Sequence, residues 1–521
     1  MQIANFIVNQ ILSVPAYLVG LITAVGLLAM GKKSGQVIGG ALKATLGFLI
    51  LGAGAEVVVA SLKPLGELIL KTTGAQGVVP TNEAIVSIAA AQFGAQVAWV
   101  MIGGFLVSLI IARLTPLKYV FLTGHHMFFM ATMLTVVLSV AKPHPVLQVV
   151  VASVLLGTIM TVMPAVSQPY TKKVTGNDKL AIGHFGTLGY VAAGAVGQAV
   201  GRKSRSTEDI KVPEGLRFLR DSMVATALSM VLFYVVFCAW AWIGLGSDIA
   251  FAMLKAKDGG DFIMKGVAQG LQFGIGVSII LYGVRTILAE LVPAFEGISR
   301  KVVPGAVPAL DCPIVYPFAP NAVLIGFISS FAGGLVSFAL LAWVFGPALG
   351  LALILPGMVP HFFTGGAAGV FGNATGGRRG AVFGGFTNGV LISFLPAFLL
   401  GVLGTLGFAN TTFGDADFAW YGFLVGHIIK LGPIGGLAGL AALSALLLIS
   451  AIWVQKRFVD SGWEPAAKRT AWLNEQKEQA KAAKTAAAAE AKAAKQKAAA
   501  AASSKNASST DDEAAPTEAK A

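Results

Sequence analysis

The amino-acid sequence predicts an all-α polytopic membrane protein, because its charge content is low and its apolar runs are long. Of the 521 residues, 55% are apolar and 12% are charged, against about 25% charged residues in soluble domains. Residues 456–521 hold 12 of the 38 Lys and Arg and nine of the 25 Asp and Glu. Too few charges remain in residues 1–455 to cover the surface of a soluble domain. The net charge of +13 does not indicate nucleic-acid binding, because the basic residues lie between apolar runs.

Eleven apolar runs have the length that a transmembrane helix needs, since a bilayer core about 30 Å thick is crossed by roughly 20 residues. They cover residues 6–30, 36–62, 84–112, 119–141, 145–166, 222–254, 266–291, 320–345, 347–371, 381–409 and 418–454. The N-terminus lacks the basic region of a cleaved signal peptide. We therefore expect about eleven transmembrane helices, some of them broken by Pro and Gly.

The distribution of Lys and Arg predicts the orientation, because cytoplasmic loops are rich in both residues. With the N-terminus outside, 19 basic residues fall in cytoplasmic loops and six fall in external ones. The opposite orientation would invert this ratio. The C-terminal tail is therefore expected in the cytoplasm.

Two segments are expected to interrupt the spans. Residues 183–200 are apolar but lie between two basic patches, so they are expected to enter and leave the membrane on the cytoplasmic face. Residues 304–320 contain five prolines and Asp311. Non-helical backbone at membrane depth occurs where protein buries it or where it lines a watery cavity, and transporters bind substrates at such breaks. Both segments are therefore candidate sites.

The tail, residues 456–521, differs in composition from the transmembrane domain, residues 1–455. Residues 466–501 are dominated by Ala, Lys, Glu and Gln, which favour helix, and they have no apolar stripe to bury. Residues 502–521 have the composition of disordered segments. We expect a solvated extension, helical and then disordered, with a partner- or lipid-binding role as the alternative.

The sequence indicates no cofactor or metal site. Cys238 and Cys312 show no metal or redox spacing, and both are expected to be inert packing residues. The chain contains no GxxxxGK[ST], HExxH or GxSxG motif, so it lacks the common signatures of nucleotide binding and of two hydrolase classes.

Polar residues within the apolar runs are the candidate binding residues, because an ionisable group there is costly unless it is paired or functional. His125 and His184 each follow a glycine where a span or broken segment begins. They are expected to donate hydrogen bonds to an oxygen-rich ligand, although histidines in spans also serve as hydrogen-bonded links between helices. Asp311 has no basic residue nearby in the sequence and is the strongest site candidate. Asn82 and Glu83 either cap a helix or bind ligand.

A further group of charged residues follows in the run LYGVRTILAELVPAFEGISRK. Arg285, Glu290, Glu296 and Arg300 lie close enough in sequence to pair with one another. We expect a structural network there.

Several stretches resemble the ascorbate-specific membrane permease, enzyme IIC, of the bacterial phosphoenolpyruvate-dependent phosphotransferase system. They are GVRTILAELVPAFEGISRKVVPGAVPALDCPIVYPFAPNAVLIGF, TPLKYVFLTGHHMFF, LAIGHFG, LGFLILGAGAEVVVASLKP and LPGMVPHFFTGGAAGVFGNATGGRRGA, and the resemblance covers about residues 10–455. It implies eleven transmembrane segments in the bacterial inner membrane and a homodimer. It also implies a mobile core domain that moves against a dimerising scaffold domain, in an elevator mechanism.

The same resemblance implies a function and a site. The substrate would be L-ascorbate or a related sugar acid, phosphorylated on delivery by the phosphocysteine of a separate enzyme IIB, which an enzyme IIA recharges. The substrate-binding positions carried over by motif are Asn82, Glu83, His125, Phe129, His184, Phe185 and Asp311. Family members can carry glutamine in place of Phe129 and Phe185, a Thr-Tyr pair in place of Asn82-Glu83 and serine in place of Ala55, so the choice among sugar acids stays open.

Three functions remain to be separated. In the first, a phosphotransferase permease, the chain needs no nucleophile of its own, and Asp311 would accept the proton of the attacking hydroxyl as the catalytic residue. In the second, a proton-coupled secondary transporter moves a sugar acid or polyol without phosphorylating it, and Glu83 or Asp311 would carry the proton. The third is a non-transporting membrane scaffold whose helical tail recruits partners.

Overall fold

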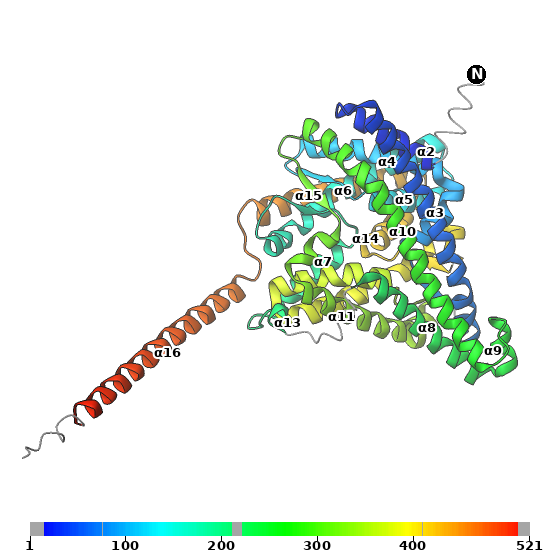
Figure 1. The fold of residues 1–521 in the computed structure, drawn as a ribbon. Helices are drawn as coiled ribbons and strands as arrows, with labels where there is room; N and C mark the ends of the chain where they lie inside the picture. Colours follow the sequence, from blue (N-terminus) through cyan, green and yellow to red (C-terminus); the bar gives the residue numbers. More distant parts are fainter. Residues whose placement is uncertain (1–14, 75–76, 211–220, 409, 509–521) are drawn as a thin grey trace, which may run out of the picture. The chain divides into compact units, whose positions relative to one another are not determined.

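The computed structural model describes residues 15–74, 77–210, 221–408 and 410–508. The chain divides into two compact units, Met1–Pro465 and Ala466–Ala521. In the described part of the first unit, the α-helices are α2 (Pro15–Ala29), α3 (Ser34–Thr73), α4 (Asn82–Leu114), α5 (Gly124–Ser139), α6 (Pro145–Thr175), α7 (Thr187–Val200), α8 (Ser222–Leu245), α9 (Ser247–Met253), α10 (Gly259–Val302), α11 (Pro320–Leu340), α12 (Gly346–Leu349), α13 (Met358–Leu399), α14 (Ala416–Ile428) and α15 (Pro433–Val454). Figure 1 shows their arrangement.

Seven helical segments among the described residues are long and apolar enough to cross a membrane. They are Ser34–Thr72, Gln92–Leu114, Pro145–Thr175, Gly259–Ile279, Pro320–Leu349, Val359–Val402 and Pro433–Val459. Shorter apolar helices cover Gly124–Ser139, Thr187–Val200 and Met230–Leu245. The prediction of a mostly helical, polytopic membrane protein is confirmed.

Some of the expected spans differ from the observed helices. The run 418–454 is divided between α14 and α15, because Gly432 takes φ 88° and Pro433 begins a new helix. The runs 347–371 and 381–409 fall largely in α13, whose backbone breaks at Gly377 (φ 57°, ψ −146°). Glycine adopts such positive φ angles without the steric cost that other residues have.

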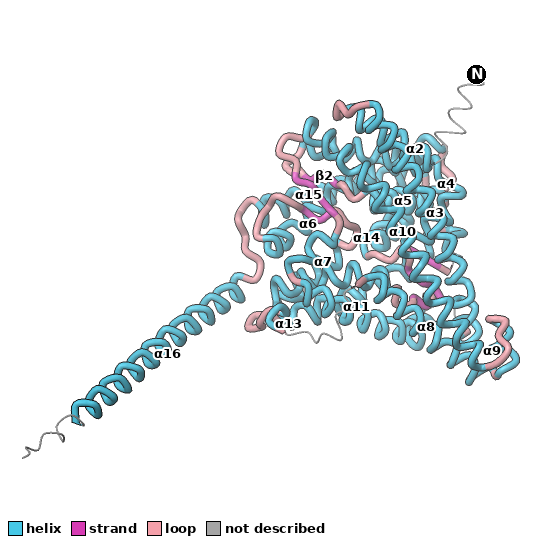
Figure 2. The backbone as a smooth tube through the Cα atoms, viewed as in Figure 1, coloured by secondary structure: helices cyan, strands magenta, loops and turns pink. Residues whose placement is uncertain are grey.

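Within the described ranges, six short strands, which the sequence did not predict, form two parallel sheets. The strands are β1 (Gly77–Pro80), β2 (Tyr119–Phe121), β3 (Ala181–Ile182), β4 (Val307–Leu310), β5 (Leu353–Ile354) and β6 (Thr411–Thr412). Their orders are β5–β1–β6 and β2–β4–β3. Figure 2 shows the strands in magenta among the helices. Pairing between strands satisfies backbone groups that could not contact water inside a membrane.

Each strand leads within a few residues into a helix. The strands β1, β2 and β3 precede α4, α5 and α7, and β5 and β6 precede α13 and α14. After β4 the chain continues as a short 3₁₀ helix, η4 (Cys312–Phe318). The Pro-rich segment 304–320 is therefore non-α over β4 and η4, as its prolines predicted.

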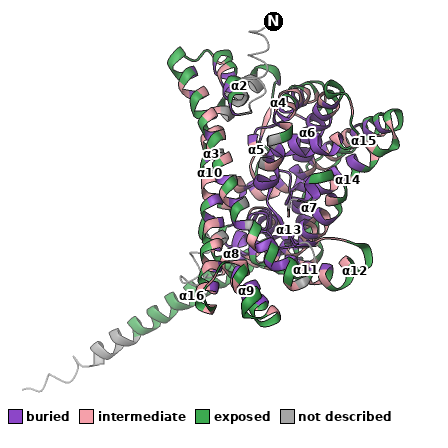
Figure 3. Cartoon of the chain, turned by 90° about the vertical axis from the view of Figure 1, so that its right-hand side faces the viewer, coloured by how far each residue is buried: buried purple, intermediate pink, exposed green. Residues whose placement is uncertain are grey.

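The helices of the first unit pack in two groups. In one group α10 packs along α3 and α8, and α2 packs on α3. In the other, α13 packs on α11 and α7, while α4 packs on α5 and α6, and α15 packs on α6. Figure 3 shows exposed residues along α3 and α10, where Ile38 and Tyr282 are 61% and 64% exposed. Such apolar faces suit contact with lipid or with a second membrane-embedded surface.

Helix α16 (Ala467–Ser508) makes up most of the described part of the tail, and its residues 477–500 are all exposed. The second unit begins at Ala466, ten residues after the expected boundary, because the chain continues from α15 as a π-helix through Val459. The helix also extends past the expected end at residue 501. Residues 509–521, where disorder was expected, lie outside the described residues.

The close contact of α11 and α13 predicts a sensitive position. A Cβ atom on Gly369 would lie 2.6 Å from Gly326 Cα and closer still to Ala322 O. Gly369→Ala should separate the two backbones and destabilise the fold by about 1–3 kcal/mol. Thermal unfolding of the detergent-solubilised protein measures this. Gly39→Ala on α3, where a Cβ meets nothing within 4 Å, is the matched control, and equal melting temperatures for the two variants would contradict the prediction.

Candidate functional site

A cavity of about 230 Å³ lies where α4, α5, α10 and the start of α13 meet the segments that lead into η4, α7 and α14. Its lining residues are Asn82, Glu83, His125, His126, Phe129, His184, Arg285, Asp311, Pro313, Val359, Pro360, Phe363 and Asp415. Six of the seven sequence-predicted site residues are among them. The fold therefore brings together positions that are more than 200 residues apart in the chain.

Phe185 is the seventh predicted residue, and it does not line the cavity. Its side chain is fully buried and stacks on Phe121, with ring centroids 4.9 Å apart. Its backbone N–H donates to His126 Nδ1 at 3.4 Å. Phe185 therefore contributes to the site through its backbone, while its ring belongs to the core.

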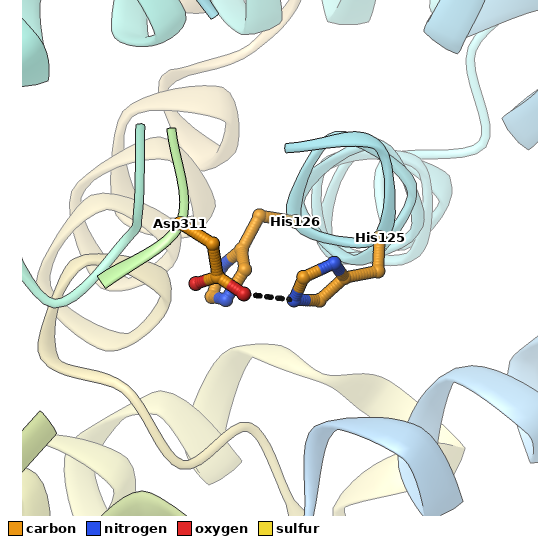
Figure 4. A group of neighbouring side chains, drawn as sticks. All are labelled: His125, His126 and Asp311. Carbon is orange, nitrogen blue, oxygen red and sulfur yellow. Dashed lines mark ion pairs between the residues drawn. The ribbon is translucent and has the colours of Figure 1, made fainter. Parts of the chain in front are cut away.

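Asp311 lies between His125 and His184. Figure 4 shows Asp311 with its partner His125 and with His126. Its Oδ2 is 3.6 Å from His125 Nε2, and its Oδ1 is 3.8 Å from His184 Nε2. Oδ1 also accepts the Cys312 N–H at 2.7 Å, which caps η4 and fixes the carboxylate. The side chain of Asp311 is 36% exposed, so it is the most accessible of the three.

The hydrogen bonds of the buried histidines assign their neutral tautomers. His184 Nδ1 accepts the Gly186 N–H at 3.0 Å and lies 2.8 Å from Tyr190 Oη. His126 Nδ1 accepts the Phe185 N–H. With Nδ1 occupied as an acceptor, each neutral ring carries its proton on Nε2. Both rings are thus arranged as hydrogen-bond donors.

These tautomers bear on whether the site suits a metal ion. Three sets of side chains bring ligand-type atoms within 4.8 Å of one another: His125, His126 and Asp311; His126, His184 and Asp415; and His184, Asp311 and Cys312. A histidine ligand must present an unprotonated nitrogen to the metal, whereas the free Nε2 atoms of His126 and His184 carry protons. The arrangement therefore favours an oxygen-rich ligand over a metal ion.

Asn82 is hydrogen-bonded at both ends of its amide to the segment before α14. Its Nδ2 donates to Asp415 Oδ2 at 2.8 Å, and its Oδ1 accepts the Gly414 N–H at 2.8 Å. Thr81, not Asn82, is the N-cap residue of α4. Sequence analysis missed Asp415, although GDAD before an apolar run was a visible signal of carboxylates at the start of a span.

Glu83 is the second acidic residue of this side of the cavity. Its side chain is 9% exposed, and its Oε2 is buried without a hydrogen-bond partner. An unpaired buried carboxylate oxygen is costly. A ligand that donates a hydrogen bond, or a proton on Glu83 itself, would satisfy it.

Glu290 has an ion-pair partner outside the network that the sequence predicted. Glu290 Oε1 pairs with Lys43 Nζ of α3 at 3.0 Å, because the packing of α10 on α3 brings this lysine closer than sequence spacing suggests. Arg285 lines the cavity instead. The side chains of Glu296 and Arg300 lie outside the described part of the chain.

The remaining histidines and cysteines have structural contacts. His361 Nδ1 is 2.8 Å from Ser330 Oγ, His427 Nδ1 is 2.8 Å from Phe423 O, and His144 accepts the Val146 N–H. Cys238 lies in the apolar core between α8, α3 and α10, and Cys312 is fully buried beside Tyr316. These contacts fit the packing role that was expected of both thiols.

Residues 10–417 match the family described as the PTS system sugar-specific permease component. This chain belongs to that family. The ascorbate-specific PTS system EIIC component of Mycoplasma pneumoniae is 30% identical over an alignment of 439 positions, which covers 75% of this chain and 66% of the relative. The chain thus spans a little under two thirds of that relative's length.

The pairing of Asn82 with Asp415 in this permease predicts a non-additive response. Asn82→Ala should destabilise the protein by about 1.5–3 kcal/mol, because it leaves the buried Asp415 carboxylate without its amide donor. Adding Asp415→Ala should recover part of this loss, since the unpaired charge is then gone. Thermal unfolding of the two single variants and the double variant forms the test, and strictly additive losses would contradict the pairing.

Proposed function

We propose that this permease carries L-ascorbate or a related sugar acid across the bacterial inner membrane and that the substrate is phosphorylated on delivery. The phosphoryl donor would be the phosphocysteine of an enzyme IIB, recharged by an enzyme IIA. Family membership supports transport within a phosphotransferase system, and the name of the Mycoplasma relative supports the substrate class.

The observation that carries the proposal is the convergence of helix starts and hydrogen-bonding side chains on one cavity. Asn82 and Glu83 begin α4, His125 lies in the first turn of α5, and Asp311 caps η4. Helix N-termini present partial positive charge and free N–H groups. Together with the imidazole donors and Arg285, they suit a small ligand rich in oxygen atoms.

The side chains suggest a division of roles. His125 and His184 would donate hydrogen bonds to substrate oxygens, while Asp311, accessible between them, would accept the proton of the hydroxyl that attacks the phosphoryl group. Phosphoryl transfer depends mainly on positioning and charge stabilisation. The permease would therefore supply the acceptor and its geometry, and enzyme IIB would supply the covalent phosphoryl group.

The two helix groups suggest how the substrate moves. We assign α2, α3, α8 and α10 to a scaffold domain that dimerises, and the helices around the cavity to a core domain that slides against it as an elevator. The exposed apolar faces of α3 and α10 support this assignment. Our proposal also includes eleven crossings, counted from the apolar runs of the sequence, with the N-terminus outside and the tail in the cytoplasm, as the distribution of basic residues predicts.

A proton-coupled secondary transporter is the second candidate, and one observation favours it. The unpaired Oε2 of buried Glu83 is an atom on which a transported proton could reside. Such a transporter would release unmodified substrate, and its uptake would stop when a protonophore is added.

Asp311→Asn separates binding from phosphorylation. Because a positioned general base contributes about 10²–10⁴-fold, the variant should lose phosphorylated product by at least about 100-fold while substrate binding falls much less. Uptake of labelled ascorbate into vesicles supplied with enzymes IIA and IIB and phosphoenolpyruvate measures this. His427→Gln, away from the cavity, is the control. Full phosphorylation by Asp311→Asn would remove Asp311 from the mechanism.

Glu83→Gln distinguishes the two candidates. It removes a carboxylate that repels an anionic sugar acid when it is ionised, so under conditions in which Glu83 is ionised the variant should bind ascorbate about tenfold more tightly than the wild type. Phosphorylating uptake should continue. Glu67→Gln, at an exposed position of α3, should change neither property. Loss of all uptake in Glu83→Gln, with free substrate as the wild-type product, would favour the proton-coupled transporter.

A further inference from the structure

Asp417 is a fully buried carboxylate in the first turn of α14, and it does not line the cavity. Its Oδ2 accepts the Thr187 N–H at 2.7 Å, and its Oδ1 accepts the Leu188 N–H at 3.0 Å and the Trp420 Nε1–H at 2.9 Å. Three N–H donors on one carboxylate make a strong, charge-assisted set. Nothing in the proposed chemistry uses Asp417, so its purpose lies in what it holds.

The carboxylate caps a helix that has no side-chain cap of its own. Helix α7 begins at Thr187, and its N-cap residue, Gly186, makes no side-chain capping hydrogen bond. The first N–H groups of a helix need partners from outside it. The Asp417 carboxylate, which belongs to a different helix, accepts two of these N–H groups. Its negative charge also interacts favourably with the positive end of the α7 dipole.

The same residue holds the turn before α7 from its other side. The Asp417 backbone N–H donates to Phe185 O at 2.9 Å. Residues 185, 187 and 188 are therefore all bonded to Asp417, on either side of the Gly186 N–H that His184 Nδ1 accepts. Thr187 Oγ1 also donates to His184 O at 2.9 Å. The orientation of the His184 ring thus depends on a turn that Asp417 fixes at both ends.

We propose that Asp417 is a positioning residue, which acts through His184 by keeping its Nε2–H directed toward Asp311 and the ligand. The inference rests on the proposed function only for its binding readout, because the orientation of His184 is a property of the ligand-free protein. The segment before Asp417 strengthens the idea, since Gly414 and Asp415 hold Asn82 on the other side of the cavity. The segment 414–417 is therefore hydrogen-bonded both to Asn82 and to the turn that carries His184.

A double-mutant cycle of Asp417 and His184 tests whether Asp417 affects ligand binding through His184. Asp417→Asn should weaken the binding of labelled ascorbate to purified permease by about tenfold, the factor expected for losing charge-assisted bonds. In a His184→Gln background the same change should cost less than about twofold, because the group being positioned is absent. A merely structural role for Asp417 would give equal losses in both backgrounds, and that result would overturn the proposal.

Trp420→Phe is a milder second variant, which keeps the test decisive where Asp417→Asn does not fold. It removes only one of the three donors to the carboxylate, so the loss of affinity should be about threefold and should again vanish in the His184→Gln background. An equal loss in the two backgrounds would overturn the proposal for this variant as well.

A spectroscopic readout separates failure of this proposal from failure of the proposed substrate. In ligand-free permease labelled with ¹⁵N-histidine, the His184 signals, assigned by their absence in His184→Gln, should show an unprotonated Nδ1. Asp417→Asn should shift or split these signals. If the wild type binds no ascorbate, the proposed substrate is wrong while the spectra still decide the role of Asp417. Unchanged spectra would overturn that role.

Discussion

The site of this permease depends on the need to pair backbone groups that the fold buries away from water. Six segments leave helical geometry close to the cavity, and their N–H and C=O groups lie where water cannot satisfy them all. Two parallel sheets, β5–β1–β6 and β2–β4–β3, solve this problem with very short ladders. The pairing fixes where each chain segment turns into the next helix, and so it fixes where the first helical residues point.

The consequences for the cavity follow from chain direction. All the strand pairs are parallel, so neighbouring strands end at the same edge of their sheet. Asn82 follows β1 and Asp415 follows β6, and these two side chains bond to each other. Likewise Asp311 follows β4, and His125 and His184 follow β2 and β3. Each sheet thereby delivers a cluster of polar side chains, and the two clusters face one ligand-sized space.

Buried carboxylates then divide into those that face the cavity and those that support it. Asp417 has three N–H donors and no access to the cavity, whereas Glu83 has an unpaired oxygen within it. The two carboxylates differ in their hydrogen-bond partners. A buried charge with a full set of donors is stable, whereas one without them needs a ligand or a proton. The protein has few charged residues. Those that face the cavity can interact with a ligand, and those that are fully hydrogen-bonded behind it hold the backbone of the site in place.

The sequence by itself determined the membrane class, because charge content and run length depend only on composition and order. It also indicated the non-helical break at 304–320 from its prolines. Its polar residues and its family resemblance together selected Asn82, Glu83, His125, Phe129, His184 and Asp311, which the fold gathers around one cavity. It did not predict the sheets, since strands of two to four residues leave no periodicity to detect. It also misplaced the partner of Glu290 and the side chain of Phe185, and it missed Asp415 and Asp417. Only the tertiary structure decided these, because each depends on hydrogen bonds or packing between segments that are distant in the chain.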